Sequence, residues 1–373
     1  MKRIKAVSSI VFLVIFITNL HAQTENANSI NTPPEVSIAG TQLLSINSTI
    51  TNKQYNLYIN LPTDYSDTTK VYPVVYLLDA QYDFTLMQSI FGEQYYDGFI
   101  PEMVIVGITW GGNNPNYDSL RRGDFTPTPE KRTPWGGNAS NFLQFIKKEL
   151  IPFIESKYRV RSDNRTLVGT SLGDLFTLYT MFHETNLFSR YLVTSPAVAW
   201  DNGVVNSYEK EFALKNTKLP IKLYIGIGQY EDPTALNNFV NVLKSRNYTG
   251  FNLKTRVLED VGHSGTKPLG YTWGIQYVFA RPELRITTKE LKKYEGIYSV
   301  SPEEYLKLYV KKDHLVLYDL DGTIIPLYAE TENDFYAKGI HILIHFKKDN
   351  AGKTVGFQIE RFGSTSFAKA FAL

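Results

Sequence analysis

Short apolar runs and stretches with helical spacing alternate along the chain between about residues 40 and 282. The runs are continuous and rich in β-branched residues, which is typical of strands buried on both faces of a sheet. Strands that alternate with helices predict an α/β fold, with a mostly parallel sheet covered by helices. The predicted strands are 72–78, 104–108, 166–169, 191–195, 222–228 and 253–259, and the predicted helices are 141–158, 172–182, 233–246 and 269–279.

The pattern changes at residues 280–296, after which only short strands separated by turn signals follow. Asp321-Gly322 and Asn350-Ala351-Gly352 are typical hairpin turns. We therefore expect two domains, an α/β domain at 39–282 and a small all-β domain at 283–373. The second domain is expected to be a small barrel or a sandwich.

The N-terminus has the pattern of a signal peptide. A basic head with Lys2, Arg3 and Lys5 precedes the apolar segment Val7 to Leu20, and Leu-His-Ala fits a cleavage site before Gln23. We expect a signal peptide at 1–22, a flexible leader at 23–38 and a periplasmic or secreted protein. The alternative is a membrane anchor; no other stretch is long and apolar enough to span a bilayer.

Composition excludes several classes of chemistry. The formal net charge of the chain is +2, which gives no indication of a nucleic-acid partner. The absence of cysteine excludes disulfides, a thiol nucleophile and a lipid anchor at a cysteine. His341 and His345 have no Cys, Asp or Glu between them, so no metal site is expected, and no phosphate-binding loop or cofactor motif is present.

Gly169-Thr170-Ser171-Leu172-Gly173 fits the G-x-S-x-G pattern between a predicted strand and a predicted helix. In that setting the serine lies on a sharp turn with its hydroxyl exposed as a nucleophile. The backbone N–H of Leu172 would then stabilise a developing oxyanion. The alternative is an ordinary serine that caps the helix.

A nucleophilic serine needs a histidine base, and the histidines can be sorted by position. His183 lies on the same predicted helix as Ser171, about 18 Å further along its axis. His314, His341 and His345 lie on predicted strands of the β domain. His21 is lost with the signal peptide, so His263 is the candidate base.

The acid that orients the histidine should lie between Ser171 and His263, at the end of a strand. Glu231 and Asp232 both follow the strand 222–228. Asp260 is a poorer candidate because it is so close in sequence to His263. The second oxyanion donor is expected from the backbone of Ala80 or Gln81.

These segments resemble the putative esterase family, also called esterase-D-like, which includes enterochelin esterases, feruloyl esterases and S-formylglutathione hydrolases. The resemblance covers most of residues 40–280. It implies an α/β-hydrolase fold, and it favours Glu231 over Asp232 because GQYE resembles the acid position of the family. The matching segments are YPVVYLLDAQYDF, RRGDFTP, the helix before RTLVGTSLG, SPAVAW, GQYE and GHSGTKP.

Asp174 departs from the family pattern, which has a second glycine at this position. A carboxylate here favours the helix dipole but would oppose a nearby oxyanion, unless the side chain points away to solvent. Four aromatic residues near the expected site are candidates for substrate binding: Tyr82, Trp110, Trp200 and Tyr230. The alternative for each is ordinary core packing.

The sequence therefore predicts an exported serine esterase that acts on a small-molecule or glycan ester. Siderophore esters and acylated or feruloylated polysaccharides are the substrates that the resemblance implies. Alternatives are an acyltransferase with the same triad, or a non-catalytic binding module on the hydrolase fold. The role of the β domain and the oligomeric state stay open.

Overall fold

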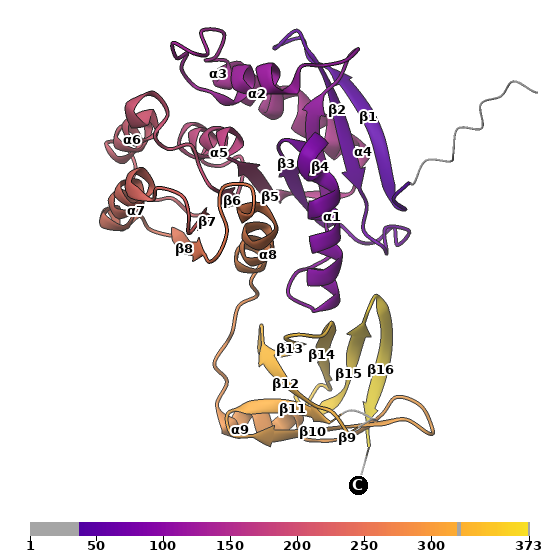
Figure 1. Cartoon of the computed structure of the whole chain (residues 1–373). Helices are drawn as coiled ribbons and strands as arrows, with labels where there is room; N and C mark the ends of the chain where they lie inside the picture. The colour runs from indigo at the N-terminus through magenta and orange to yellow at the C-terminus, as the bar shows by residue number, and fades with distance from the viewer. Residues whose placement is uncertain (1–36, 319–321, 372–373) are drawn as a thin grey trace, which may run out of the picture. The chain divides into compact units, whose positions relative to one another are not determined.

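The computed structural model describes residues 37–318 and 322–371. The predicted signal peptide and nearly all of the predicted leader lie outside the described residues. Figure 1 shows an α/β part followed by a barrel of strands. The strands of the α/β part are β1 (Thr41–Asn47), β2 (Gln54–Asn60), β3 (Tyr72–Leu77), β4 (Val104–Trp110), β5 (Val160–Thr170), β6 (Arg190–Thr194), β7 (Lys222–Gly228) and β8 (Asn252–Leu258).

These strands form one sheet in the order β1-β2-β4-β3-β5-β6-β7-β8. The pairs from β4 to β8 are parallel, whereas β1 and β2 add an antiparallel edge. Because β5, β6, β7 and β8 are parallel neighbours, the loops after them emerge at the same edge of the sheet. This confirms the predicted fold class and places the loops that carry Ser171, Glu231 and His263 at one edge.

Both faces of the sheet are buried, as the continuous apolar runs predict. Along β3, Val74 and Tyr76 pack into one core and Val75 and Leu77 into the other, as the alternation of side chains in a strand requires. Helices α1 and α8 supply the second core, and α3, α5 and α7 supply the first. The helices are α1 (Ala80–Tyr96), α2 (Tyr117–Phe125), α3 (Ala139–Phe145), α4 (Ile151–Lys157), α5 (Leu172–His183), α6 (Trp200–Ala213), α7 (Thr234–Arg246) and α8 (Thr266–Val278), with a π-helical turn (Ile146–Leu150) between α3 and α4.

Five elements of the α/β part were not among the predicted ones: β1, β2, α1, α2 and α6. Helix α1 shows why a periodicity search overlooks them. Its buried face carries Asp83 and Gln94 among the apolar side chains, so the apolar spacing is interrupted where polar groups are satisfied by tertiary contacts. The predicted helix over 141–158 is real, but the π-helical turn divides it.

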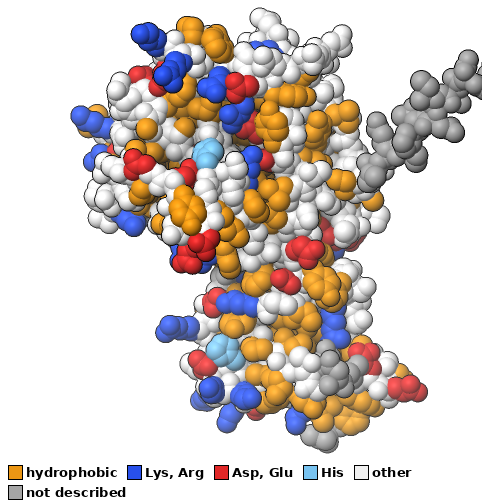
Figure 2. Space-filling model, viewed as in Figure 1, with side chains coloured by type: hydrophobic (Ala, Val, Ile, Leu, Met, Phe, Trp, Pro, Cys, Tyr) orange, Lys and Arg blue, Asp and Glu red, His pale blue; other side chains and the backbone are white. Residues whose placement is uncertain are grey.

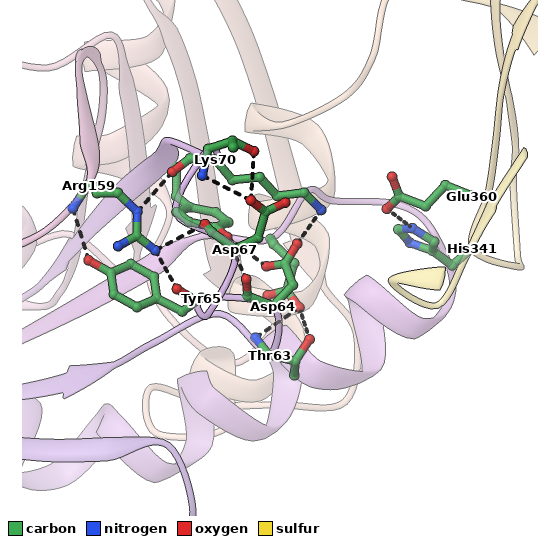
Figure 3. Close-up of polar contacts among 11 residues, drawn as sticks. Thr63, Asp64, Tyr65, Asp67, Lys70, Arg159, His341 and Glu360 are labelled. Atoms are coloured by element: carbon green, nitrogen blue, oxygen red, sulfur yellow. Dashed lines mark hydrogen bonds and ion pairs between the residues drawn. The ribbon is translucent and has the colours of Figure 1, made fainter. Parts of the chain in front are cut away.

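Arg159 contacts the loop between β2 and β3 at several points (Figure 3). Arg159 donates to the backbone carbonyls of Lys70 and Asp67, both at 3.2 Å, and to that of Tyr65. Its guanidinium also lies 4.0 Å from the centroid of the Tyr65 ring. A planar group with several donors suits this combination of hydrogen bonds and stacking, which a lysine cannot reproduce.

The C-terminal strands close into an eight-stranded antiparallel barrel in the order β10-β11-β12-β13-β14-β15-β16-β9. The prediction left a barrel and a sandwich open; the structure is a barrel. Its core combines leucine and isoleucine side chains with a cluster of aromatic rings, which has contacts among Tyr294, Phe335, Phe346 and Phe357. The elements are α9 (Thr288–Leu291), a 3₁₀ turn (Lys292–Tyr294), β9 (Gly296–Ser299), β10 (Tyr305–Lys311), β11 (His314–Tyr318), β12 (Ile324–Ala329), β13 (Asp334–Ala337), β14 (Ile342–Lys348), β15 (Thr354–Arg361) and β16 (Ser364–Ala370).

Acidic and basic side chains are interspersed on the face drawn in Figure 2. This face carries no extended basic surface of the kind that nucleic acids require. Among the described residues, none of the helices has the length and apolar character needed to cross a bilayer.

Candidate active site

Ser171 lies between the end of β5 and the start of α5 in a conformation that non-glycine residues rarely adopt. Its φ is 60° and its ψ is −114°, and a positive φ costs a residue with a Cβ on the order of 1–3 kcal/mol. The Ser171 side chain makes no capping hydrogen bond to α5. The geometry is thus that of a strained turn with a free hydroxyl, and the helix-capping role weighed for this serine is absent.

The turn depends on a close approach that only glycine permits at one position. A Cβ added to Gly169 would lie 2.6 Å from the carbonyl carbon of Gly173, much closer than any stable contact. A Cβ added to Gly173 would meet Leu78 and the Asp79 carboxylate at ordinary distances of 3.5–3.6 Å. The first glycine of the motif is therefore a packing requirement, and the second is not.

His263 and Glu231 form a direct pair. The His263 Nδ1 atom lies 2.7 Å from Glu231 Oε1. His263 lies in the loop between β8 and α8, where its carbonyl oxygen accepts a hydrogen bond of 2.6 Å from the hydroxyl of Thr266. Its side chain is 54% exposed, so the other ring nitrogen has access to an incoming substrate.

Glu231 is held by two further groups that the sequence did not single out. The hydroxyl of Ser195 donates to Glu231 Oε2 at 2.6 Å, and the backbone N–H of Gly228 donates to the same oxygen at 2.9 Å. Partial burial raises the pKa of Glu231, but the hydrogen bonds from Ser195, His263 and Gly228 outweigh it and lower the pKa overall. The carboxylate is thus fixed in its ionised form, with one oxygen aimed at His263.

Asp232, the second candidate acid, has a different partner. Its Oδ1 accepts a hydrogen bond of 2.9 Å from the backbone N–H of Thr234, at the start of α7. That contact fixes the helix terminus, as expected for a carboxylate in this position. Asp260 accepts a long hydrogen bond of 3.4 Å from the hydroxyl of Tyr230.

The backbone connects Ser171 to the His263–Glu231 pair. The Ser171 N–H donates to the carbonyl oxygen of Thr194 at 3.2 Å, and the Ser171 carbonyl accepts from the N–H of Ala197 at 3.2 Å. Ser195 lies between these two contacts and holds Glu231. The nucleophile candidate and the histidine pair are therefore tied to the same turn after β6.

Three backbone N–H groups of the expected oxyanion site lie at helix starts. Leu172 is the first residue of α5, and Ala80 and Gln81 are the first two of α1. N–H groups in a first helical turn have no intrahelical acceptor. They are available to an anion, which the helix dipole also favours.

Asp79 fixes the start of α1. Its backbone is left-handed, with φ 54°, and its side chain is held by Arg121 through two hydrogen bonds of 2.9 and 2.7 Å. A two-point contact of this kind is strong and sets orientation as well as distance. The sequence gives no indication that Arg121 is the partner of Asp79, although both residues lie in segments that resemble the family pattern.

The four candidate aromatic residues differ in access. Tyr82 and Tyr230 are 56% and 69% exposed, and Trp200 is half-buried with its indole N–H bonded to Thr128. Trp110, in contrast, is buried, so its expected role in substrate binding is corrected: it is a core residue. Its indole N–H donates to Asp124 at 2.8 Å.

Asp124 itself is a structural centre. Fully buried, it accepts hydrogen bonds from Trp110, from the hydroxyl of Tyr55 at 2.9 Å and from Lys53. A buried charge needs such partners. The aspartate of the RRGDFTP segment therefore joins α2 to β2 and β4.

Asp174 does not point to solvent, which corrects that alternative. Its side chain is fully buried, and its Oδ2 accepts a hydrogen bond of 2.6 Å from the backbone N–H of Thr194. Burial raises the pKa of Asp174 well above its usual value, against the effect of the hydrogen bond from the Thr194 N–H. This shift favours the uncharged form, and in that form the carboxyl group does not oppose a nearby oxyanion.

A strained serine after a parallel strand, with a histidine–carboxylate pair from two later loops, is the arrangement expected in an α/β-hydrolase. The model of the putative esterase family matches residues 48–260. The chain belongs to this family, and its membership supports an ester hydrolase.

Individual relatives agree with this assignment. The chain is 31% identical over 225 residues to the ferri-bacillibactin esterase BesA of Bacillus subtilis (strain 168), covering 56% of this chain and 77% of that one. Among solved structures, the BES protein from Bacillus cereus has 24% identity and a TM-score of 0.60, covering 67% of this chain and 99% of that one. An IroE-like serine hydrolase from Shewanella oneidensis has 25% identity and a TM-score of 0.58, covering 67% and 84%.

Proposed function

We propose that this protein is a serine esterase that hydrolyses a siderophore ester, with Ser171 as nucleophile, His263 as base and Glu231 as the acid that orients the histidine. The observation that carries the proposal is the 2.7 Å contact between His263 and Glu231 at the sheet edge where the strained Ser171 also lies. The substrate class follows from BesA, whose name states that it acts on ferri-bacillibactin.

In the first half of the reaction, Ser171 Oγ attacks the ester carbonyl carbon while His263 Nε2 takes the hydroxyl proton. Glu231 accepts the Nδ1–H hydrogen bond and stabilises the imidazolium. The N–H groups of Leu172 and of Ala80 or Gln81 bind the oxyanion. When the bond to the leaving alcohol breaks, His263 gives its proton to the alcohol oxygen and an acyl-enzyme remains.

In the second half, water attacks the acyl carbon and His263 takes a proton from it. The bond from the acyl carbon to Ser171 Oγ then breaks, and the proton returns to that oxygen. The products are a carboxylic acid and the free enzyme. No hydrogen bond joins Ser171 Oγ to another described residue, and in unliganded enzymes such contacts often tighten only with substrate.

A fluorophosphonate probe tests the nucleophile directly. We expect covalent labelling of the wild-type protein at Ser171, located by peptide mass spectrometry, and none in Ser171→Ala. Hydrolysis of ferri-bacillibactin, followed by chromatography of the released acids, tests the substrate class. Turnover of p-nitrophenyl esters without any turnover of ferri-bacillibactin would support the esterase and contradict the siderophore substrate.

Export is part of the same proposal and rests on the signal-peptide pattern of residues 1–22. Cell fractionation should recover the protein outside the cytoplasm, with an N-terminus at Gln23. An intact Met1 on the isolated protein would contradict cleavage.

A further inference from the structure

Asp174 occupies the position of the acid in a helix capping box. In such a box, the serine at the N-cap bonds the backbone N–H three residues on, and the acid at that residue bonds back to the N–H of the serine. Here Ser171 is the N-cap residue but makes no side-chain cap. The Ser171 N–H donates instead to the carbonyl oxygen of Thr194 at 3.2 Å, and the buried Oδ1 of Asp174 accepts from no described group. Neither half of the box is formed: the Asp174 carboxyl group is bonded elsewhere, and the serine hydroxyl is left free.

The same carboxyl group also holds the neighbouring strand. Asp174 Oδ2 accepts from the backbone N–H of Thr194 at 2.6 Å, at the end of β6. The next residue, Ser195, has a positive φ of 56° and donates to Glu231. One buried side chain in the first turn of α5, three residues after the nucleophile candidate, thus bonds the strand end that supports the acid.

We propose that Asp174 is a positioning residue that fixes the Ser171 turn to the end of β6, and so aligns the serine with the His263–Glu231 pair. The inference rests on the proposed serine mechanism. The glycine that the family pattern places here has no side chain and could not make the hydrogen bond to Thr194. The hydrogen bond between Asp174 and Thr194 is therefore a contact that the family pattern does not supply.

The surroundings of Asp174 favour its uncharged form. Among the described residues no lysine or arginine forms an ion pair with it, and the buried carboxyl groups nearest to it act against ionisation. The titratable and charged groups that face this region from the adjoining elements are Asp79 with its partner Arg121, Asp83 with its partner Lys267, and Tyr271.

Three variants separate positioning from mere stability. Asp174→Asn keeps the shape and a carbonyl acceptor for the Thr194 N–H, whereas Asp174→Leu keeps the size and removes the acceptor. Glu209→Gln is a matched control, because Glu209 on α6 is also a fully buried carboxylate. Its partners are Arg246 at the end of α7 and Tyr248 in the loop after α7. The readouts are kcat and KM on p-nitrophenyl butyrate and the rate of fluorophosphonate labelling per folded molecule.

We expect Asp174→Leu to lower kcat and the labelling rate on the order of 10- to 100-fold with little change in KM, because small misplacements of a nucleophile are costly. Asp174→Asn should restore both rates to within about threefold of wild type. Glu209→Gln should lower the melting temperature and leave the labelling rate per folded molecule unchanged. If Asp174→Leu does not fold, Asp174→Ser, which is too short to reach the Thr194 N–H, takes its place with the same expectation.

A folded Asp174→Leu or Asp174→Ser protein that labels at the wild-type rate would overturn the proposal. A large rate increase in Asp174→Asn would also overturn it, since it would show that the native side chain is an anion that opposes the oxyanion. Wild-type labelling at Ser171 in the same experiment separates these results from a failure of the serine mechanism. If wild type is not labelled, the proposed function fails and this inference fails with it.

Discussion

Arg121 donates hydrogen bonds to both carboxylate oxygens of Asp79, at 2.9 and 2.7 Å. Because Asp79 lies 42 residues earlier in the chain, these bonds join α2 to the start of α1. Asp79 has a left-handed backbone immediately before the N–H groups of Ala80 and Gln81. The direction of those N–H groups therefore depends on a side-chain contact as well as on the local turn.

Replacement of this arginine tests the dependence. Arg121→Lys keeps the charge but loses the planar two-point contact. We expect kcat on p-nitrophenyl butyrate to fall about tenfold, which corresponds to about 1.4 kcal/mol of transition-state stabilisation. Arg122→Lys, on the same helix with an exposed partner, is the control and should retain wild-type kcat. Equal rates for both variants would contradict a role of Asp79 in the oxyanion site.

The two candidate acids can be separated by paired amide variants. Glu231→Gln removes the charge that orients and stabilises His263, and should lower kcat roughly 100- to 10,000-fold. Asp232→Asn should change kcat less than about threefold, because its carboxylate bonds only the start of α7. Steady-state kinetics at saturating substrate distinguishes them, and the opposite ranking would reassign the acid.

Gly169 and Gly173 should differ in how well they tolerate substitution by alanine. Gly169→Ala would place a Cβ 2.6 Å from the Gly173 backbone, which forces the strand and helix apart. We expect loss of fluorophosphonate labelling and a lower melting temperature. Gly173→Ala meets only ordinary contacts and should fold with a melting temperature near that of wild type. Similar destabilisation by both substitutions would argue against the close approach seen at Gly169.

Asp124 should matter for stability more than for chemistry. Asp124→Asn removes the buried charge that bonds Lys53, Tyr55 and Trp110, and losing a hydrogen bond to a charged group costs about 1.5–3 kcal/mol. Denaturant unfolding measures the loss. Asp118→Asn, on the same helix but with an exposed ion pair, should cost less than about 1 kcal/mol.

The raised pKa of Asp174 predicts a pH effect on stability with a definite sign. Between the ordinary pKa of an aspartate and the raised pKa of the folded protein, the folded state keeps a proton that the unfolded state has lost. In that window the free energy of unfolding falls as pH rises, by up to about 1.4 kcal/mol per pH unit. Asp174→Asn has no carboxyl group to titrate here, so its free energy of unfolding relative to that of wild type should increase from pH 4 to pH 8 in urea unfolding.

An unchanged stability difference across that pH range would mean that Asp174 titrates normally in the folded protein.

The pH dependence of stability that Glu231 contributes has the opposite sign, because the pKa of Glu231 is lowered. Its contribution to stability is present above the ordinary glutamate pKa and is lost as pH falls through the folded value. The difference in free energy of unfolding between Glu231→Gln and wild type should therefore become smaller at acidic pH in urea unfolding.

Several features of the fold and of the candidate site can be predicted from the sequence. The continuous runs at 72–78 and 222–228 predict strands buried on both faces, because that environment admits few polar side chains. The setting of Ser171 between a strand and a helix predicts the sharp turn. The small number of histidines, and the order of serine, acid and histidine along the chain, leave His263 as the base candidate.

The sequence by itself thus determined the fold class, the strand–turn–helix around Ser171 and a short list of site candidates, since these depend on periodicity and local spacing. Only the tertiary structure decided which acid meets His263, that Trp110 is a core residue, and that the second domain closes into a barrel. It alone revealed the partners of Asp79, Asp124 and Asp174. These outcomes depend on which distant side chains share a buried environment, and the hydrogen bonds that satisfy a buried polar group leave no periodic trace along the chain.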